Sequence, residues 1–347
     1  MIKKISYMQL FLLCCFGTMM ILCIFNIMRN RKNGVTTNEQ IEKTGFALDT
    51  VITITLYGNK DEKLLTNCFH LCNEYERIFS RTHTSGDVYK MNQELKNTKN
   101  PACTFVVSDS IKEVVERSIY YSRESDGGFD FTIEPVSSLW NFKDSEKKIP
   151  SDSLIIKQQQ NVNYEKCRPE GNELTLEQGM GLDFGAIAKG YIADQLKEYL
   201  LSEGVTSAVI NLGGNILCIG KRTDGSPFQI GIRMPFGEQD EIIAAIYADD
   251  ISVVSSGIYE RYFEKDHRSY HHLLDPKTGY PFENDLIGVT IISKHSVDGD
   301  GLSTACFSMG LEKGLAYLNE KEDVYGVFIT SDKKMHFSEG FEGFMIR

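Results

Sequence analysis

The sequence predicts an α+β fold: a single domain of mostly antiparallel sheet with flanking helices, preceded by an N-terminal membrane anchor. Strand-like segments follow one another as hairpins and do not alternate with helices in βαβ order. The chain has 347 residues, 41% of them hydrophobic and 24% charged, which is ordinary for a globular protein with a substantial core. Because neither an internal repeat nor a second linker interrupts it, residues 45–347 are expected to form one domain.

The anchor is predicted from an uncharged stretch, Ile5–Met28, that has basic residues on both sides. A signal-peptide core is usually ~7–15 residues and ends at a small-x-small site, which this stretch lacks. Its 24 residues are enough to span a bilayer, so residues 1–33 are expected to be an uncleaved anchor and residues 34–44 a polar linker. Lipid attachment is not favoured, because leucine or cysteine precedes each cysteine of the anchor. Basic residues at both ends leave the orientation open.

The charge of the body limits its partners. Residues 1–33 contain five of the 37 Lys and Arg residues and none of the 48 Asp and Glu residues, so the remainder has a net charge of −16. Such a body would be repelled by the phosphate backbone of nucleic acids, and no nucleic-acid partner is expected. A phosphate-rich ligand would require a metal ion or a local concentration of positive charge.

The cysteines indicate neither a zinc site nor a disulfide framework. Three of the nine lie in the anchor, and the other six are scattered without a C-x-x-C pair. Cys68 and Cys72 are four residues apart in a helical pattern, which is typical of buried thiols.

Hydrophobic periodicity predicts the elements of the body. Residues 46–57 alternate β-branched and apolar side chains as a strand does, and two strands are expected around Gly213-Gly214 within residues 207–219. More strands are expected in residues 228–254 and at the C-terminus. Four segments are predicted to be helices: residues 60–79, 108–125, 185–203 and 303–319.

The most informative segment is His271–Pro281, where two imidazoles lead into an Asp-Pro-x-x-Gly turn. Pro276 fixes φ and Gly279 can adopt a positive φ, so the segment should bend sharply. Histidine exchanges a proton near neutral pH, and the chain has only seven. Taken alone, the segment could equally be a hairpin with two surface histidines.

A second segment, Gly179–Gly185, resembles a dinucleotide fingerprint, but Phe184 stands where the third glycine is needed. A Rossmann site is therefore not expected. Asp183 precedes a predicted helix whose N-terminus could attract an anion, and Lys189 could reach a phosphate or the carboxylate of Asp183. The alternative is that Asp183 only caps the helix and Lys189 is solvated.

A third segment, Val297–Ala305, resembles the beginning of a calcium loop, but its ligand register is wrong. Asp300 and Thr304 are four residues apart near a predicted helix start, so their side chains should face the same way. A carboxylate beside a hydroxyl suits Mg²⁺, which takes few protein ligands. A capping Asp and a buried Thr are the alternative.

Seven segments, in this order, resemble the ApbE family, the FAD:protein FMN transferases. The resemblance covers the chain from about Thr44 to its C-terminus, and the seven segments together are far more specific than any one of them. They are Leu48–Thr50, Gly127–Thr132, Asp183–Asp194, Asn211–Asn215, Ser256–Arg261, His272–Pro281 and Asp300–Ala305.

The resemblance implies an ApbE-like, T-fold-related catalytic domain that transfers the FMN part of FAD to a Thr or Ser hydroxyl and releases AMP. It implies that His272 is the catalytic residue and that Mg²⁺ binds Asp300, Thr304 and the main-chain oxygen of Ala186. The residues that it implies for FAD binding are Leu48, Thr82, Gly128, Phe129, Asp130, Asp183, Lys189 and Leu274. It gives His271 no role.

Two departures from the family pattern concern flavin packing. Leu48-Asp49 replaces a Met-Gly pair, and Thr82 stands where an aromatic residue is common.

The physical chemistry agrees with this reaction, because a histidine that titrates near neutrality can take the proton of the attacking hydroxyl. Mg²⁺ and Lys189 can offset the charge of the pyrophosphate. No acceptor motif is found within this chain, so the modified residue is expected on a separate flavoprotein. The alternatives are a FAD pyrophosphatase that yields FMN and AMP, and a non-catalytic FAD-binding protein. By resemblance to exported members, the domain is expected on the extracytoplasmic side of the cell membrane.

Overall fold

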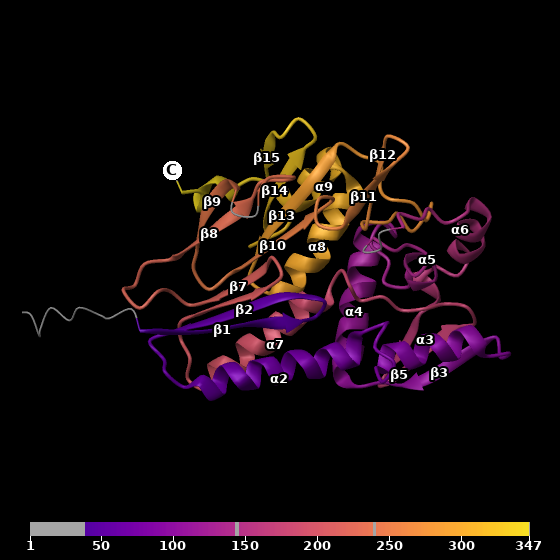
Figure 1. The fold of residues 1–347 in the computed structure, drawn as a ribbon, viewed down its shortest axis with the longest axis horizontal. Coiled ribbons are helices and arrows are strands. Elements are labelled where there is room, and N and C mark those ends of the chain that lie inside the picture. The colour runs from indigo at the N-terminus through magenta and orange to yellow at the C-terminus, as the bar shows by residue number, and fades with distance from the viewer. Residues whose placement is uncertain (1–38, 143–145, 239–240, 347) are drawn as a thin grey trace, which may run out of the picture. The chain divides into compact units, whose positions relative to one another are not determined.

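An eight-stranded sheet forms the centre of the computed structural model, which describes residues 39–142, 146–238 and 241–346 (Figure 1). Every neighbouring pair in this sheet is antiparallel, as expected for the predicted α+β class. The strands, in spatial order, are β1 (Gln40–Ala47), β2 (Thr50–Tyr57), β6 (Ala208–Leu212), β7 (Asn215–Ile219), β10 (Ser252–Gly257), β13 (Leu286–Ser293), β14 (Tyr325–Thr330) and β15 (Met335–Phe337).

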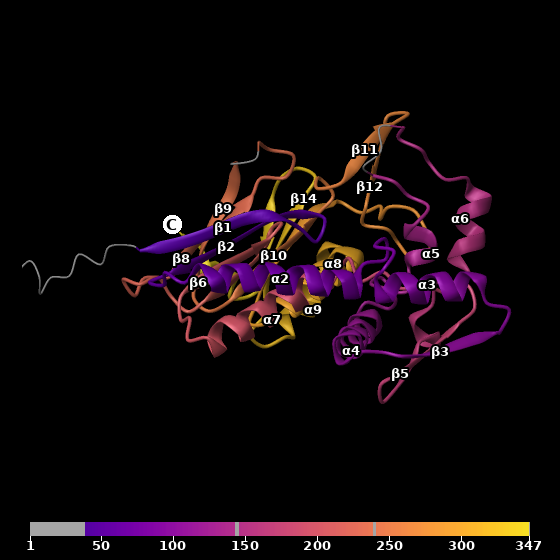
Figure 2. The same cartoon turned by 60° about the horizontal axis from the view of Figure 1, so that its bottom comes forward.

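Both faces of this sheet are covered, so its central strands are apolar on both sides. Helices α2 (Glu62–Phe79), α7 (Ala188–Ser202) and α8 (Ser296–Met309) pack on one face, as Figures 1 and 2 show. The other face packs against the hairpin of β8 (Phe228–Arg233) and β9 (Ile242–Ala248) and against η2 (Phe341–Phe344). Ile291 and Ile292, adjacent in β13, belong to the two different cores because side chains alternate along a strand.

The remaining elements form two smaller groups. A three-stranded sheet of β3 (Ala102–Val106), β5 (Glu173–Glu177) and β4 (Arg168–Glu170) lies in the part of the chain that also holds α3 (Asp87–Asn97), α4 (Asp109–Glu124) and η1 (Tyr164–Lys166). The second group is an aromatic core around Trp140, formed by the β11–β12 hairpin (Tyr262–Lys265, Arg268–His271), α5 (Glu134–Ser137) and α6 (Asp152–Gln159).

The beginning of the body differs from the sequence prediction. Residues 40–44, expected to be linker, form the first half of β1, and the strand expected over 46–57 contains a two-residue turn. Leu48 and Asp49 both have positive φ, 55° and 61°, as the tight turns of hairpins require. Neither is the glycine or asparagine that usually indicates this turn, so the turn could not be predicted from the sequence. The predicted anchor and the rest of the linker lie outside the described residues.

The last two helices also differ, because the helix expected over residues 303–319 is two. Helix α8 begins at Ser296, where the carboxylate of Asp194 accepts the amides of Ser296 (2.8 Å) and Val297 (2.9 Å). It ends at Gly310, whose φ of 78° separates it from α9 (Leu311–Asn319). Asp300 therefore lies inside a helix and not at its start. Helix α7 begins three residues later than predicted.

Within the described residues, no helix has the length and apolar character needed to cross a bilayer. The six cysteines of the body are buried free thiols, and Cys68 and Cys72 are the two for which this was predicted.

Helices α7 and α8 approach each other closely at Gly190. A β-carbon at this position would lie 2.3 Å from the main-chain oxygen of Ser296. We therefore expect Gly190→Ala to lower the free energy of unfolding by about 1–3 kcal/mol, because the helices must separate to admit the methyl group. Urea unfolding measures this change. Gly343→Ala, where nothing lies within 4 Å, is the matched control and should change stability little; equal midpoints for the two variants would contradict the close approach.

Candidate active site

The His271–Pro281 segment forms the predicted bend. The amide of Gly279 donates to the carbonyl of Asp275 (2.7 Å), and the Asp275 side chain accepts the amide of Lys277 (2.9 Å). Gly279 has a φ of 74°, and a β-carbon there would collide with Ile155. The bend is therefore fixed by its own hydrogen bonds and by the lack of space around its glycine.

The two histidines are neutral because their surroundings exclude water. His271 is 5% exposed, its Nε2 lies 3.2 Å from the carbonyl of Phe282, and burial lowers its pKa to about 4. The pKa of His272 is lowered to about 3, mainly by burial and then by the charges of Arg261, His271 and Lys189. In neither ring does Nδ1 have a hydrogen-bond partner among the described residues. The expectation that His272 titrates near neutrality is therefore wrong for the ligand-free protein.

Asp183 is held by a partner that the sequence analysis did not consider. Its carboxylate accepts Arg81 Nε (2.9 Å), the hydroxyl of Ser137 (2.7 Å) and the amide of Gly185 (3.0 Å). It does not cap α7, whose N-cap position is Ile187. Arg81, and not Lys189, is the cation that pairs with Asp183.

Asp300 links α8 to α7. It is 5% exposed, and its Oδ2 accepts the amide of Gly190 (2.6 Å) while its Oδ1 accepts the side-chain amide of Asn215 (3.0 Å). Gly190 is the third residue of α7, and the first amides of a helix have no partner within it; Asp300 supplies one for Gly190. Ala186 lies before the N-cap residue Ile187, so its carbonyl is outside the hydrogen-bond ladder of the helix. Burial raises the pKa of Asp300.

Three of the predicted site residues come from distant parts of the chain, and one of them, Lys189, lies near each of the other two. Lys189, in the first turn of α7, is close enough to lower the pKa of both Asp300 and His272. Thr304 follows Asp300 by one turn of α8 and is partly exposed. The fold thus brings together a carboxylate, a lysine and a neutral imidazole from α8, α7 and the bend after β12.

The other residues predicted to bind FAD are more dispersed. Leu48 lies at the tip of the β1–β2 hairpin, next to Asp49, whose carboxylate lies 3.5 Å from Arg261. Thr82 is exposed and its amide bonds to Ser80 (3.2 Å). Leu274 is buried in the aromatic core with Trp140.

The Gly127–Thr132 loop packs against the end of α8. A β-carbon on Gly128 would lie 2.1 Å from the hydroxyl of Ser308, and Phe129 is buried. The carboxylate of Asp130 accepts the amide and hydroxyl of Thr132 (2.8 and 2.6 Å) and the amide of Tyr164 (3.1 Å). Asp130 therefore stabilises its own loop with its side chain.

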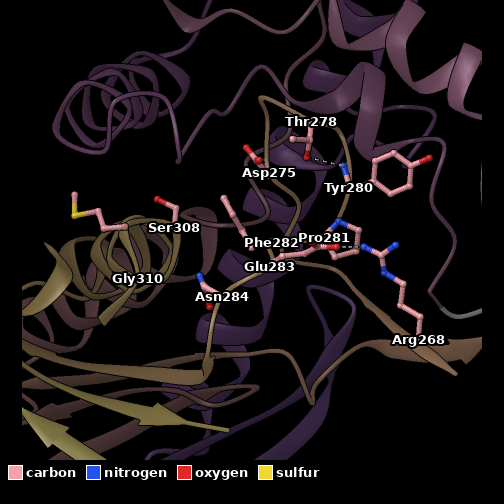
Figure 3. Close-up of a pocket in the computed structure, with 11 residues that line it drawn as sticks. Arg268, Asp275, Thr278, Tyr280, Pro281, Phe282, Glu283, Asn284, Ser308 and Gly310 are labelled. Carbon is pink, nitrogen blue, oxygen red and sulfur yellow. Dashed lines mark hydrogen bonds and ion pairs between the residues drawn. The ribbon is translucent and has the colours of Figure 1, made fainter. Parts of the chain in front are cut away.

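A cavity of about 440 Å³ adjoins the bend and the end of α8. Figure 3 shows Asp275 and Thr278 on the side of the bend and Ser308 on the side of α8, while Arg268 and Glu283 form an ion pair at the rim. Among the described residues, neither Asp300, Lys189 nor His272 lines it. Asp300 precedes Ser308 by eight residues, about 12 Å along the helix at 1.5 Å per residue.

The predicted metal set contains a single carboxylate. Accordingly, no group of three or more His, Cys, Asp and Glu side chains suited to a metal occurs in the described part of the chain. The set nevertheless suits Mg²⁺, because both Asp300 oxygens keep a free lone pair and the Ala186 carbonyl lies outside the hydrogen-bond ladder of α7.

Comparison with known proteins places this arrangement in a family. Residues 48–329 match the ApbE family. The chain belongs to the ApbE family. Among curated relatives, a FAD:protein FMN transferase of Klebsiella pneumoniae (strain 342) is 35% identical over 83% of this chain and 88% of its own length. Another of the same name, from Treponema pallidum (strain Nichols), is 31% identical over 80% and 79%.

Solved structures of ApbE proteins have the same fold. The ApbE protein of Thermotoga maritima superposes with a TM-score of 0.80 at 28% identity, covering 89% of this chain and all of that one. The flavin transferase ApbE of Vibrio cholerae gives a TM-score of 0.77 at 27% identity, covering 88% and 99%.

Three residues of this ApbE chain were missed by sequence reasoning. Neither Arg81 nor Ser137 was given a role. Asn215 closes the Asn-Leu-Gly-Gly-Asn segment but was given no role. Nothing local marks any of them, because each acts on a residue at least 46 positions away.

Protonation of His271 should make this protein less stable in acid. Its folded pKa of about 4 lies below its ordinary value of 6.5, so the unfolded chain binds the proton more tightly between these pH values. The stability from the neutral ring is complete above pH 6.5 and is lost as pH falls toward 4, by on the order of 3 kcal/mol.

We therefore expect His271→Gln to show a weaker loss of stability between pH 7.5 and 4.5 than the wild type. Urea unfolding at both pH values measures it, and the comparison at pH 7.5 gives the packing cost of the substitution itself. If the free energy of unfolding fell equally in the two proteins between these pH values, His271 would not be a buried neutral residue.

Proposed function

We propose that this enzyme, a transferase of the ApbE family, moves the FMN part of FAD to a Thr or Ser hydroxyl on a separate flavoprotein. The hydroxyl oxygen attacks the FMN-side phosphorus, the bond to the bridging oxygen breaks, and AMP leaves. The observation that carries the proposal is the grouping of Asp300, Lys189 and His272 in a chain whose relatives are named FAD:protein FMN transferases.

We assign the Mg²⁺ site to the side chains of Asp300 and Thr304 and the carbonyl of Ala186. The two hydrogen bonds to Asp300 support this assignment, as does the position of Ala186 before the N-cap of α7. Mg²⁺ bound there would neutralise charge on the pyrophosphate and on the departing AMP. Lys189, in the first turn of α7, adds a positive charge beside the same site, which an otherwise acidic body needs in order to hold FAD.

His272 is the group that takes the proton of the attacking hydroxyl. Its ring is neutral at physiological pH, so one of its two nitrogens has a free lone pair that can accept a hydrogen bond. A pKa of about 3 makes a weak base. The negative pyrophosphate of bound FAD would raise that pKa by offsetting the charges of Arg261 and Lys189. The free enzyme and its FAD complex should therefore differ in the basicity of this histidine.

Two other functions use the same site. A pyrophosphatase would let water replace the hydroxyl, and a binding protein would hold FAD unchanged. Incubation with FAD, Mg²⁺ and a candidate acceptor separates them: flavin fluorescence that stays on the acceptor band after denaturing electrophoresis indicates transfer. FMN in solution beside a dark acceptor band would indicate hydrolysis, and unchanged FAD would indicate binding alone.

In that assay, His272→Ala should lower the rate of transfer by about 10²–10⁴-fold, the usual contribution of a general base. The affinity for FAD, followed by isothermal titration, should change little. His70→Ala, an exposed histidine on α2, is the control. Loss of FAD binding in His272→Ala would contradict the role of a base, because the residue would then be needed to hold the substrate.

We further propose that residues 1–33 anchor the enzyme in the cell membrane with its catalytic domain on the extracytoplasmic side. The uncharged stretch Ile5–Met28 supports an anchor. Protease added to intact cells should then remove the domain, whereas a cytoplasmic protein of the same cells stays intact. Protection of the domain until the cells are lysed would reverse the orientation.

A further inference from the structure

A chain of buried hydrogen bonds leads from the central sheet to Asp300. The hydroxyl of Ser252 donates to that of Ser296 (2.9 Å), and the hydroxyl of Ser296 donates to Oδ1 of Asn215 (2.7 Å). The Nδ2 group of Asn215 then donates to Oδ1 of Asp300 (3.0 Å). None of these four residues is more than 5% exposed.

The order of donors fixes the orientation of the Asn215 amide. A carboxylate can only accept, so the nitrogen of the amide must face Asp300 and its oxygen must face Ser296. Ser296 is held in turn by Asp194, whose carboxylate accepts the main-chain amides of Ser296 and Val297. The amide of Asn215 is thus locked between β7, which carries it, and the first turns of α8.

We propose that Asn215 is a positioning residue for the divalent metal ion: it sets the plane of the Asp300 carboxylate. Asn215 holds Oδ1 and the Gly190 amide holds Oδ2, so the carboxylate cannot rotate and its free lone pairs keep one direction. The inference rests on the proposed function, in which Asp300 is a metal ligand. Hydrogen bonds to a ligating group typically account for about 10–100-fold in metal affinity.

The competing explanation is that the four residues only stabilise the junction of β7, β10 and α8. Buried hydrogen bonds do stabilise folded proteins, so a loss of stability alone would not separate the two roles. Metal affinity separates them, because a merely structural network would leave the affinity of the folded protein unchanged.

The test is the binding of Mn²⁺ to the full-length protein without FAD, measured by electron paramagnetic resonance of the free ion. Mn²⁺ accepts the same oxygen ligands as Mg²⁺. We expect Asn215→Ala to weaken Mn²⁺ binding by about 10–100-fold. Asn215→Leu should do the same, since it retains the size of the side chain but has no amide group to donate. Ser296→Ala, which removes the hydrogen bond to Oδ1 of Asn215 but leaves its bond to Asp300, should have a smaller effect.

Two controls complete the design. Asn211→Ala removes the other asparagine of the same segment, whose side chain accepts the amide of Gly214 (3.0 Å), and should bind Mn²⁺ as the wild type does. Asp300→Ala should abolish binding. Urea unfolding of each variant shows that the protein measured is folded.

The outcomes are distinguishable. If the wild type binds no Mn²⁺, or if Asp300→Ala binds as tightly, the metal site of the proposed function is wrong. If Asp300→Ala loses binding but both Asn215 variants keep the wild-type affinity, Asn215 does not position the ligand. Equal losses in Asn211→Ala and Asn215→Ala would also overturn the inference, because the site would then respond to any change in this turn.

Discussion

The close contact of α7 with α8 determines the geometry of the whole candidate site. Gly190 lets the helices approach until its amide reaches the carboxylate of Asp300 at 2.6 Å. That amide belongs to the first turn of α7, where it has no partner within the helix. A buried carboxylate is costly unless it is hydrogen-bonded, so Asp300 and the two amides that serve it depend on each other. The position of the Asp300 carboxylate is thus set by the distance between two helices.

Cations stand at the candidate site although the body is acidic. The residues after position 33 carry a net charge of −16, yet Arg81, Lys189 and Arg261 are placed at or beside the predicted residues. Arg81 is neutralised by Asp183, whereas Lys189 and Arg261 act on His272. These cations favour the approach of a negatively charged ligand to an acidic enzyme. Burial first, and then the charges of Arg261 and Lys189, lower the pKa of His272 and keep its imidazole uncharged.

Sequence reasoning succeeded where a signal is local. The bend after His272 was predicted from Pro276 and Gly279, and the shared face of Asp300 and Thr304 from their spacing. It failed where long-range packing decides. The start of α8 depends on a cap supplied by Asp194, about a hundred residues away, and the Leu48-Asp49 turn lacks its usual residues. The partners of Asp183 and Asp300 could not be predicted for the same reason. The lowered pKa of His272 could not be predicted either, because it depends on burial and on neighbours from other elements.

The aromatic core beneath the bend contains the only tryptophan of the chain. The indole of Trp140 donates Nε1–H to the carbonyl of Gly279 (3.0 Å) and its ring lies within 6 Å of those of Tyr270 and Tyr280. Any movement of the bend must disturb this hydrogen bond or this stacking. Because flavins absorb light where tryptophan emits, the ultraviolet emission of the unlabelled protein is a natural optical reporter of both the bend and a flavin bound beside it.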